Sequence, residues 1–442
     1  MADHAVSAHP AVQAQLDRLW SLSPGADILG LDRITRLLDR LGDPHRALPP
    51  VFHVAGTNGK GSTCAYLRAA LEAAGLTVHA YTSPHLVRFN ERIRLAGRLI
   101  DDDGLAALLD EVLDCADGIG ASFFEVTTAA AFLAFARTPA AACVIEVGLG
   151  GRLDATNVIP SPAVCGIAAL GIDHEAFLGD TLAQIATEKA GIAKPNVPLL
   201  TMRYADDIAD VIRRSAAKAG AVLLPESGLW GYRVDGDRLS YRDAGGAIEL
   251  PLPVMPGAHQ AANLALATAM LRHQRAVTID TPALAAAARH AHWPARLQRL
   301  APGPLIDGLG EVPVWLDGGH NASAGQAIAA WLDRMLPQGS GRPVTLVIGM
   351  LANKDAAGFI APFASRVARV IALPVPGHEH HDAAALAYVA RAAGIARVDS
   401  AGNIVEAMAL LAASPTDPAT VLIAGSLYLA GEALIANDEL PR

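Results

Sequence analysis

One segment of the sequence has the residue types and the spacing of a phosphate-binding loop. The apolar run Val51–Ala55 is followed by the turn Gly56-Thr57-Asn58-Gly59-Lys60-Gly61-Ser62 and then by a helical pattern. Glycines let backbone N–H groups approach phosphate oxygens, the next helix presents its positive end, and Lys60 supplies a point charge. The spacing differs from the usual Walker pattern, because Gly61 separates Lys60 from Ser62. A tight turn with a solvated lysine is the alternative, and the position between strand and helix favours phosphate binding.

Charged side chains also follow other predicted strands. Glu146 lies at the end of the run Cys143–Val147, and Asp173-His174 comes after Val164–Ala168. A carboxylate that faces a phosphate loop is typical of a Mg²⁺ ligand, and open α/β sheets bind ligands at the carboxyl ends of their strands. Lys189 closes the next helical pattern and falls at the same edge. Taken singly, these side chains also fit structural roles: a salt-bridged strand end, a packed histidine and a solvated lysine.

The second half of the chain repeats this arrangement. Asp317-Gly-Gly-His-Asn321, Gly349–Asp355 and Gly425–Gly431 each place a glycine just after an apolar run. These turns are either ordinary connections or the second face of one cleft between two domains. The glycine-rich run after Glu146 is not a dinucleotide fingerprint, because Leu153 stands where that fingerprint needs glycine.

The elements that must position these residues alternate between short β-branched runs and longer helical patterns, which is typical of the α/β class. We expect a mostly parallel sheet in residues 1–297, with a helix from about Ser62 to Gly75, and a smaller α/β domain in residues 298–442. A linker rich in proline and glycine is expected at Trp293–Pro313, and antiparallel hairpins attached to the parallel sheet at Tyr232–Leu250. The remaining predicted strands are Thr77–Tyr81, Val197–Thr201, Val314–Asp317, Val344–Gly349, Val370–Pro374 and Val421–Gly425.

Composition limits the partners and the compartment. The 442 residues hold 44 acidic and 35 basic side chains, a formal charge of −9, and no basic patch for nucleic acid or anionic lipid. The uncharged stretches 155–172 and 250–271 are interrupted by prolines and polar residues, which argues against membrane spans. No apolar leader is recognisable, and the 4 scattered cysteines fit reduced thiols. We therefore expect a soluble cytoplasmic protein with no nucleic-acid or membrane partner.

Several motifs in this order resemble the folylpolyglutamate synthase/dihydrofolate synthase family, a branch of the Mur-type ATP-dependent amide ligases. The resemblance covers nearly the whole chain and rests on His53–Ser62 (HVAGTNGKGS), Thr82–Ile93 (TSPHLVRFNERI), Glu146–Asn157 (EVGLGGRLDATN), Glu188–Ile192 (EKAGI), His259–Asn263 (HQAAN), Ala295–Gln298 (ARLQ), Asp317–Asn321 (DGGHN) and Gly349–Asp355 (GMLANKD). The sequence departs from the family at Ala295, where glycine is usual, at Gly319, where alanine is commoner, and at Ala322, where proline is frequent. The implied fold is a P-loop-containing, mostly parallel sheet domain and a smaller C-terminal Mur ligase-type domain that closes a cleft over it.

The resemblance also implies roles for particular residues. It assigns ATP contacts to Thr57, Asn58, Gly59, Lys60, Gly61, Ser62, Asn263, Arg296 and Asp317. It assigns two Mg²⁺ ions to Ser83, Glu146, His174 and Lys189, the last as a carboxylated lysine. It assigns pterin or folate contacts to Ser122, Phe123, Phe124, Glu125, Leu153, Asp154 and Ala155. Lys60, Lys189 and His174 are the implied catalytic residues.

The activity that the resemblance implies is the ATP-dependent addition of L-glutamate to dihydropteroate and to reduced folates through an acyl phosphate, carried out by a monomer. The alternatives are an enzyme that only polyglutamylates ready-made folate, a nucleotide-binding regulatory module, and a cell-wall ligase of the Mur type. The segment Ser122–Glu125 favours both activities. Glu146, His174 and Lys189 together disfavour a binding module, which needs no second metal site. A Mur enzyme usually has a further N-terminal domain, for which the residues before the phosphate loop are too few.

Overall fold

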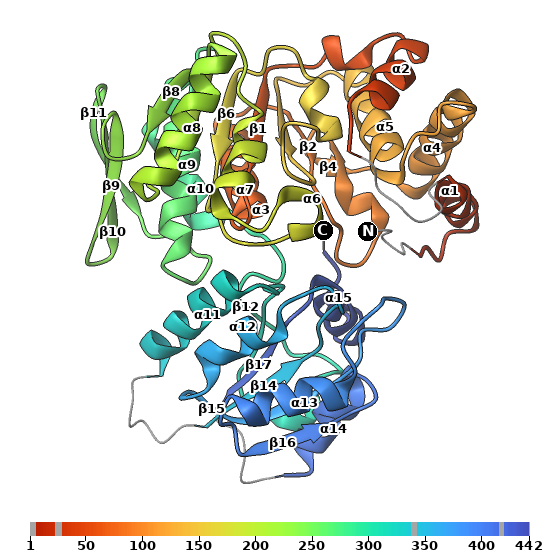
Figure 1. Ribbon diagram of the computed structural model, residues 1–442, viewed down its shortest axis with the longest axis vertical. Helices are drawn as coiled ribbons and strands as arrows, with labels where there is room; N and C mark the ends of the chain where they lie inside the picture. Colours follow the sequence, from red (N-terminus) through yellow and green to blue (C-terminus); the bar gives the residue numbers. More distant parts are fainter. Residues whose placement is uncertain (1–5, 23–28, 337–342, 415–419, 442) are drawn as a thin grey trace. The chain divides into compact units, whose positions relative to one another are not determined.

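The computed structural model describes residues 6–22, 29–336, 343–414 and 420–441. The chain divides into two compact units, Met1–Val254 with Gln260–His292, and Met255–His259 with Trp293–Arg442. Unit 1 is coloured from red to green in Figure 1, and unit 2 from blue-green to blue. Each unit is built around its own sheet flanked by helices, so the predicted α/β class is confirmed.

Unit 1 contains a sheet that, within the described residues, has eight strands in the order β4-β3-β2-β5-β1-β6-β7-β8. The strands are β1 (Val51–Ala55), β2 (Val78–Tyr81), β3 (Ile93–Leu95), β4 (Arg98–Leu99), β5 (Ala142–Glu146), β6 (Val164–Ile167), β7 (Pro198–Thr201) and β8 (Val222–Pro225). Neighbours are parallel except at β3 and β4. The predicted strands are confirmed to within one residue at each end. The hairpin of β3 and β4 was not predicted, because two or three residues are too few to show an alternating pattern.

The strand order explains where the polar residues gather. β1 lies between β5 and β6, and all three are parallel. After β1 the chain continues to β2, which lies on the β5 side of β1. Strand β6 pairs with the opposite edge of β1. The carboxyl ends of these strands therefore form a topological switch point, which is where open α/β sheets bind ligands.

Helices cover both faces of this sheet. One face packs against α1 (Pro10–Ser21), α2 (Asp32–Arg40), α4 (Asp102–Ala116), α5 (Phe123–Arg137), α7 (Leu182–Ala190) and α8 (Asp206–Ala219). The opposite face holds α3 (Lys60–Ala73), α9 (His259–His273) and α10 (Thr281–His290), and Gly166 of β6 touches Met270 of α9. The short helix α6 (Glu175–Leu178) follows β6. α3 begins two residues before the predicted start, and Gly75 follows its end with a φ of 79°.

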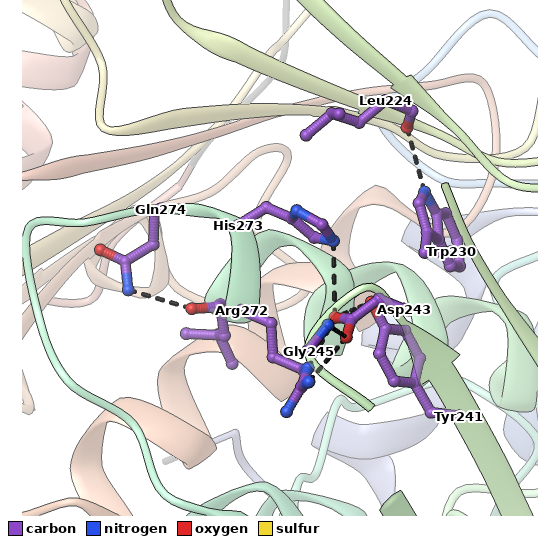
Figure 2. A network of polar contacts seen from close by, with 9 residues as sticks. Leu224, Trp230, Tyr241, Asp243, Gly245, Arg272, His273 and Gln274 are labelled. Atoms are coloured by element: carbon purple, nitrogen blue, oxygen red, sulfur yellow. Dashed lines mark hydrogen bonds and ion pairs between the residues drawn. The ribbon is translucent and has the colours of Figure 1, made fainter. Parts of the chain in front are cut away.

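A second, small sheet of unit 1 is antiparallel and has the order β11-β10-β9. It consists of β9 (Trp230–Asp235), β10 (Arg238–Asp243) and β11 (Gly246–Pro251). The predicted hairpins are confirmed, and their three strands form a sheet separate from the parallel one, with Trp230 of β9 bridging Glu226 just after β8. Figure 2 shows how Asp243 joins this sheet to α9: Arg272 donates to it from Nε and Nη2, each at 2.7 Å, and His273 Nε2 lies 3.5 Å away.

Unit 2 has a sheet that, in the described ranges, follows the order β12-β13-β17-β14-β15-β16. Its strands are β12 (Gln298–Arg299), β13 (Val314–Leu316), β14 (Val344–Ile348), β15 (Val367–Ala372), β16 (Arg397–Ser400) and β17 (Thr420–Ala424), parallel except for β12. Its helices are α11 (Ala322–Met335), α12 (Ala356–Ile360), α13 (Ala383–Ala392), α14 (Ile404–Ala412) and α15 (Leu427–Ala436). The segment Trp293–Pro313, expected to be a linker, lies in unit 2 and contributes β12.

The remaining short elements are 3₁₀ helices at Pro44–Arg46, Phe89–Arg92, Ala155–Val158, Asp307–Leu309 and Ala361–Phe363. β16 was not predicted, because Arg397 and Asp399 interrupt its apolar pattern. Among the helices of the described ranges, none has the length and apolar character needed to cross a membrane.

Candidate active site

The phosphate loop connects the buried strand β1 to α3, as predicted. Gly59 is the N-cap of α3 with a φ of 83°, and no side chain caps the helix. A side chain at Gly59 would meet Asn263 Oδ1 of α9, so this position needs glycine for its backbone conformation and for space. The first amides of a helix have no partner within it. The start of α3 at Lys60, Gly61 and Ser62 is therefore suited to an anion.

Thr57 and Asn58 have a different local role from the residues that follow them. Their backbone N–H groups donate to the carbonyl of Ala169, at 2.8 and 3.1 Å, and the Thr57 hydroxyl donates to the carbonyl of Gly171 at 3.0 Å. The segment after β6 thereby holds the loop in place. The amides at the start of α3, rather than those of Thr57 and Asn58, are in position for phosphate.

Two lysines lie at this loop. Lys60 Nζ donates to the carbonyl of Thr57 at 3.3 Å, and Lys189 Nζ donates to the carbonyl of Gly56 at 3.0 Å. Lys189 is only 4% exposed. Its pKa is lowered to about 7, mainly by burial and also by the charge of Lys60, whereas Asp173 and Asp154 oppose the shift. The structure thus places Lys189 at the phosphate loop near Lys60, and about half of its amine is neutral near pH 7.

The position of Lys189 follows from tight packing between α7 and the loop after β5. A side chain at Gly151 would lie 2.8 Å from the carbonyl of Glu188 and 3.0 Å from that of Lys189. Arg152 donates through its backbone N–H to the carbonyl of Glu188, and its side chain pairs with the Glu188 carboxylate, both at 2.8 Å. The glycine-rich segment therefore serves as the surface on which the last turn of α7 packs.

Glu146 and Ser83 lie together at the same edge of the sheet. Glu146 is the last residue of β5, is paired in register with Val54 of β1, and is 5% exposed. The backbone N–H of Ser83, just after β2, donates to Glu146 Oε2 at 3.2 Å. A buried carboxylate next to a hydroxyl and a phosphate loop fits one Mg²⁺ ion whose other ligands are phosphate oxygens and water. Consistent with that incomplete set, no group of three or more His, Cys, Asp or Glu side chains in the described parts of the chain could hold a metal by itself.

His174 begins α6 in the left-handed region, with a φ of 56°, and its backbone N–H donates to Asp173 Oδ1 at 2.8 Å. A non-glycine residue in this region is strained and is found disproportionately at functional sites. Asp173 was singled out in the sequence only as the neighbour of His174. Its charge acts on Lys189, so it belongs to the site, and its position just after β6 was the available signal.

Asn263, to which the resemblance assigns an ATP contact, belongs to unit 1 and lies against the phosphate loop, and Gln260 lies one turn before it on α9. Gln260 Nε2 donates to Ser62 Oγ at 3.3 Å, and Gln260 Oε1 accepts from Asn263 Nδ2 at 3.1 Å and from Tyr66 OH at 3.4 Å. Gln260 was not predicted as a site residue. Its spacing of three from Asn263 places both on one face of a helix, which is the pattern that could have identified it.

The segment Ser122–Glu125 caps α5 and reaches the same region. Ser122 and Glu125 form a reciprocal capping box, and Glu125 also pairs with Arg33 Nε at 2.9 Å. Phe124 lies directly against Gly148 in the loop after β5. Phe123 instead packs in the core, with its ring 5.4 Å from that of Trp20 and 5.9 Å from that of Phe89. Of the two aromatic rings, Phe124 is the one placed near the loop.

The segment Leu153-Asp154-Ala155 is fixed from within the sheet. Asp154 accepts from Leu149 N at 2.8 Å and from the Thr156 hydroxyl at 2.5 Å. Because that hydroxyl donates its proton to Asp154, His53 of β1 must donate to it from Nε2, at 2.8 Å. Burial and, to a smaller extent, the charge of Lys194 lower the pKa of His53 to about 3, so this imidazole is neutral. Burial also raises the pKa of Asp154 against the hydrogen bonds it accepts.

Arg296 and Asp317, the other predicted ATP contacts, belong to unit 2 and lie close together there. Asp317 Oδ2 accepts from Leu297 N at 2.8 Å, and Asp317 Oδ1 accepts from Gly319 N at 2.7 Å. Arg296 Nη1 donates to the carbonyl of Ala295 at 2.8 Å. The two predicted residues are therefore parts of one compact turn at the end of β13.

Comparisons with known proteins agree with this geometry. A family model described as dihydrofolate synthetase, C-terminal domain, matches residues 308–436. The chain is 36% identical over 352 residues to the dihydrofolate synthase/folylpolyglutamate synthase of Escherichia coli, covering 79% of this chain and 78% of that protein. It is 33% identical over 431 residues to a probable bifunctional folylpolyglutamate synthase/dihydropteroate synthase of Halobacterium salinarum, of which it spans only 49%.

Solved structures give the same result over nearly the full length. The fold is similar to that of E. coli FolC in complex with DHPP and ADP, with a TM-score of 0.85 and 31% identity, covering 97% of each chain. It is also similar to a bifunctional folylpolyglutamate synthase/dihydrofolate synthase with Mn, AMPPNP and L-glutamate bound, with a TM-score of 0.83 and 30% identity, covering 96% of this chain and 97% of that one.

Proposed function

The chain belongs to the dihydrofolate synthase/folylpolyglutamate synthase family, and on that premise we propose that it is an ATP-dependent ligase that adds L-glutamate to dihydropteroate and to reduced folates. The observation that carries the proposal is the buried Lys189, whose Nζ lies 3.0 Å from the phosphate-loop carbonyl of Gly56 and beside a second lysine. A simple nucleotide-binding module has no use for such a lysine. A ligase that must assemble charged groups around ATP does.

The chemistry requires activation of a carboxylate, which is a poor acyl donor. Transfer of the γ-phosphoryl group of ATP to the substrate carboxylate gives an acyl phosphate, and the amine of glutamate then displaces phosphate to form the amide. Lys60 and the start of α3 stabilise the charge on the phosphoryl oxygens in both steps. The packed loops around β1 hold the reacting groups in place.

The metal ligands are proposed from the same site. Ser83 and Glu146 would hold one Mg²⁺, and His174 and Lys189 the other. When bound, these ions neutralise phosphate oxygens and orient ATP for in-line transfer. Lys189 suits this role once its neutral amine adds CO₂, releasing one proton and forming a carbamate. The product is an anionic oxygen ligand where a cation would repel the metal.

The folate site is proposed at the loop that faces Phe124. Ser122 and Glu125 cap the start of α5, Phe124 of this helix touches Gly148 in the loop after β5, and the Leu153–Ala155 segment ends that loop. Phe123 supports this site from the core. Two loops that converge beside the phosphate site would place the substrate carboxylate near the γ-phosphoryl group.

Compartment and assembly are also proposals. The four cysteines are free thiols, and Cys64, Cys143 and Cys165 are buried, which supports a reducing compartment such as the cytoplasm. We propose a monomer, and closure of the second domain over the first stays a prediction from the sequence.

The test is to incubate the purified protein with MgATP and L-glutamate, with dihydropteroate in one vessel and tetrahydrofolate in another, and to measure ADP and product mass. We expect glutamate-dependent product in both vessels. Lys218→Ala, a change at an exposed lysine of α8, is the control for substitutions of Lys60 and Lys189 and should retain full activity. Product with tetrahydrofolate alone would establish a folylpolyglutamate synthase. Product in neither vessel would overturn the proposal.

A further inference from the structure

The loop that presents Arg296 has an unfavourable backbone conformation on both sides of that residue. Ala295 has a φ of 53° and Leu297 a φ of 46°, both in the left-handed region, and neither residue is glycine. Residues with a Cβ avoid this region because of steric repulsion with the backbone. Both side chains are fully buried. The loop therefore keeps its shape only if its surroundings impose it.

Part of that constraint comes from the turn after β13. Leu297 N donates to Asp317 Oδ2 at 2.8 Å, and Gly318 N donates to the carbonyl of Ala295 at 2.9 Å. The same carbonyl accepts from Arg296 Nη1. These contacts fix the end of the loop at Leu297 and the carbonyl of Ala295, but not the N–H of Ala295.

The N–H of Ala295 is fixed by Gln298, which is in turn held by a residue much later in the chain. It donates to Gln298 Oε1 at 2.9 Å, and Gln298 Nε2 donates to Glu439 Oε1 at 2.7 Å. Glu439 follows α15, and its other oxygen accepts from Ala301 N at 3.0 Å and from Asn437 Nδ2 at 3.1 Å. Three donors from two segments thus converge on one carboxylate.

We propose that Glu439 is a positioning residue for the nucleotide, acting on Arg296 through Gln298. An amide side chain has a donor and an acceptor end, and rotation exchanges them. Glu439 only accepts, so it holds the NH₂ end of Gln298 toward itself and the carbonyl end toward the N–H of Ala295. In a variant that lacks Glu439, the side-chain amide of Gln298 is free to rotate. Its NH₂ group can then face the N–H of Ala295, which is also a donor, and the loop loses the hydrogen bond that restrains it at Ala295. The proposal rests on the proposed ligase function and on the ATP contact that the family resemblance implies for Arg296.

The first experiment compares the full-length variants Glu439→Ala, Glu439→Gln and Arg296→Ala with the unaltered protein. We expect Glu439→Ala to raise the KM for ATP and the Kd for MgADP about fivefold to tenfold, with kcat within about twofold. Glu439→Gln keeps one acceptor and should raise KM about twofold to threefold. Glu432→Ala, an exposed change on α15, is the matched control and should alter neither constant.

A second experiment separates positioning from simple destabilisation. Glycine at position 295 adopts the left-handed region at no steric cost. Ala295→Gly should therefore recover most of the ATP affinity lost in Glu439→Ala. Gln298→Ala should raise KM as much as Glu439→Ala does, and the double variant should be no worse than either single one, because both remove the same restraint.

The outcomes are distinct. An unchanged nucleotide affinity in Glu439→Ala, additive effects with Gln298→Ala, or failure of Ala295→Gly to restore binding would each overturn the role of Glu439. Unchanged affinity in Arg296→Ala would overturn it as well, by removing the loop from the nucleotide site. If the unaltered protein binds MgADP but makes no glutamate-dependent product, the proposed ligase function fails, whereas the MgADP titrations still test Glu439.

Discussion

Asp243 and Lys189 are ionisable residues of unit 1 whose side chains are shielded from solvent, and the surroundings of the two side chains are opposite in kind. Asp243, with a side chain 3% exposed, faces the cation of Arg272 and accepts from Gly245 N at 2.8 Å and Tyr241 OH at 3.1 Å (Figure 2). Burial disfavours its charge, but the hydrogen bonds and charge of Arg272 outweigh burial, and the net pKa is lowered. Lys189 is buried as well, and after burial the largest influence on its pKa is the charge of another lysine, Lys60.

The difference separates a structural ion pair from a reactive group. A buried charge that is fully paired stabilises one arrangement, here the docking of the small sheet on α9. A buried lysine next to a like charge is held toward its neutral form, which stabilises nothing by itself but makes the amine a nucleophile at neutral pH. Changes at Asp243 should therefore affect folding, and changes at Lys189 should affect catalysis.

The largest expected effect is on activity at the lysine pair. Lys60→Ala and Lys189→Ala should each reduce ATP-dependent ligation by about 10³-fold or more, because each removes charge from the phosphoryl-transfer site. The free energy of unfolding should stay within about 1 kcal/mol of the unaltered value, because each change removes one hydrogen bond to a backbone carbonyl. ADP release and urea unfolding measure the two quantities. Turnover close to the unaltered rate in either variant would remove that lysine from the mechanism.

The next effect is on stability at Asp243. Asp243→Ala leaves Arg272 without its partner and should lower the free energy of unfolding by about 3 kcal/mol, measured by urea denaturation. The kcat of the folded protein at low temperature should not change. Asp235→Ala, an exposed change on β9, is the control and should have no effect on either quantity. A fall in kcat without a change in the free energy of unfolding would make Asp243 a residue of the active site and would contradict the distinction between Asp243 and Lys189.

A third expectation concerns pH between 6 and 8. With a pKa of about 7, the neutral fraction of Lys189 rises about tenfold over this range and then levels off, whereas a lysine at 10.5 would gain tenfold for every unit. After CO₂ is removed from the enzyme, activity should return on adding CO₂ at a fixed dissolved concentration. The rate of this reactivation should rise about tenfold from pH 6 to pH 8 and then level off, as expected for the lowered pKa. A rate that still climbs tenfold per unit above pH 8 would contradict the lowered pKa.

Between pH 6 and pH 8, the contribution of Asp243 to the free energy of unfolding should not change. A carboxylate with a lowered pKa contributes stability that is present above its unfolded pKa of 3.8 and is lost as the pH falls through its folded value. The difference in unfolding free energy between the unaltered protein and Asp243→Ala should therefore be constant from pH 6 to pH 8. A strong change in that range would show that a group other than the carboxylate, such as His273, dominates the network.

The smallest expected effect on stability comes from exchanging arginine for lysine at position 272, and the reverse exchange at position 189 tests the reactive amine. Arg272→Lys should cost about 1 kcal/mol of unfolding free energy, because lysine keeps the charge but loses the paired hydrogen bonds. Lys189→Arg should abolish CO₂-dependent activation, since a guanidinium stays protonated. Thermal unfolding and the reactivation assay test the pair. If Arg272→Lys kept the stability and Lys189→Arg kept the CO₂-dependent activation, a positive charge alone would be sufficient at both positions.

Local sequence predicted the elements of the site well. The phosphate loop, β1 and the hairpins around Gly236 and Gly245 were identified because apolar alternation, glycine and turn chemistry act over a few residues. Strands without such a pattern were missed, among them β16 with Arg397 and Asp399. Gln260 was also missed, although its spacing from Asn263 was visible.

The sequence by itself determined the α/β class, the order of the elements and the residues able to bind phosphate, because these depend on periodicity and residue type. Only the tertiary structure decided that β1 lies between β5 and β6, that Lys189 is buried beside Lys60, and that Glu439 braces the loop at Ala295. The physical reason is the separation along the chain of the residues that interact. Strand order, desolvation and the left-handed conformation of Ala295 arise from contacts between residues that are distant in the chain, and no local pattern encodes them.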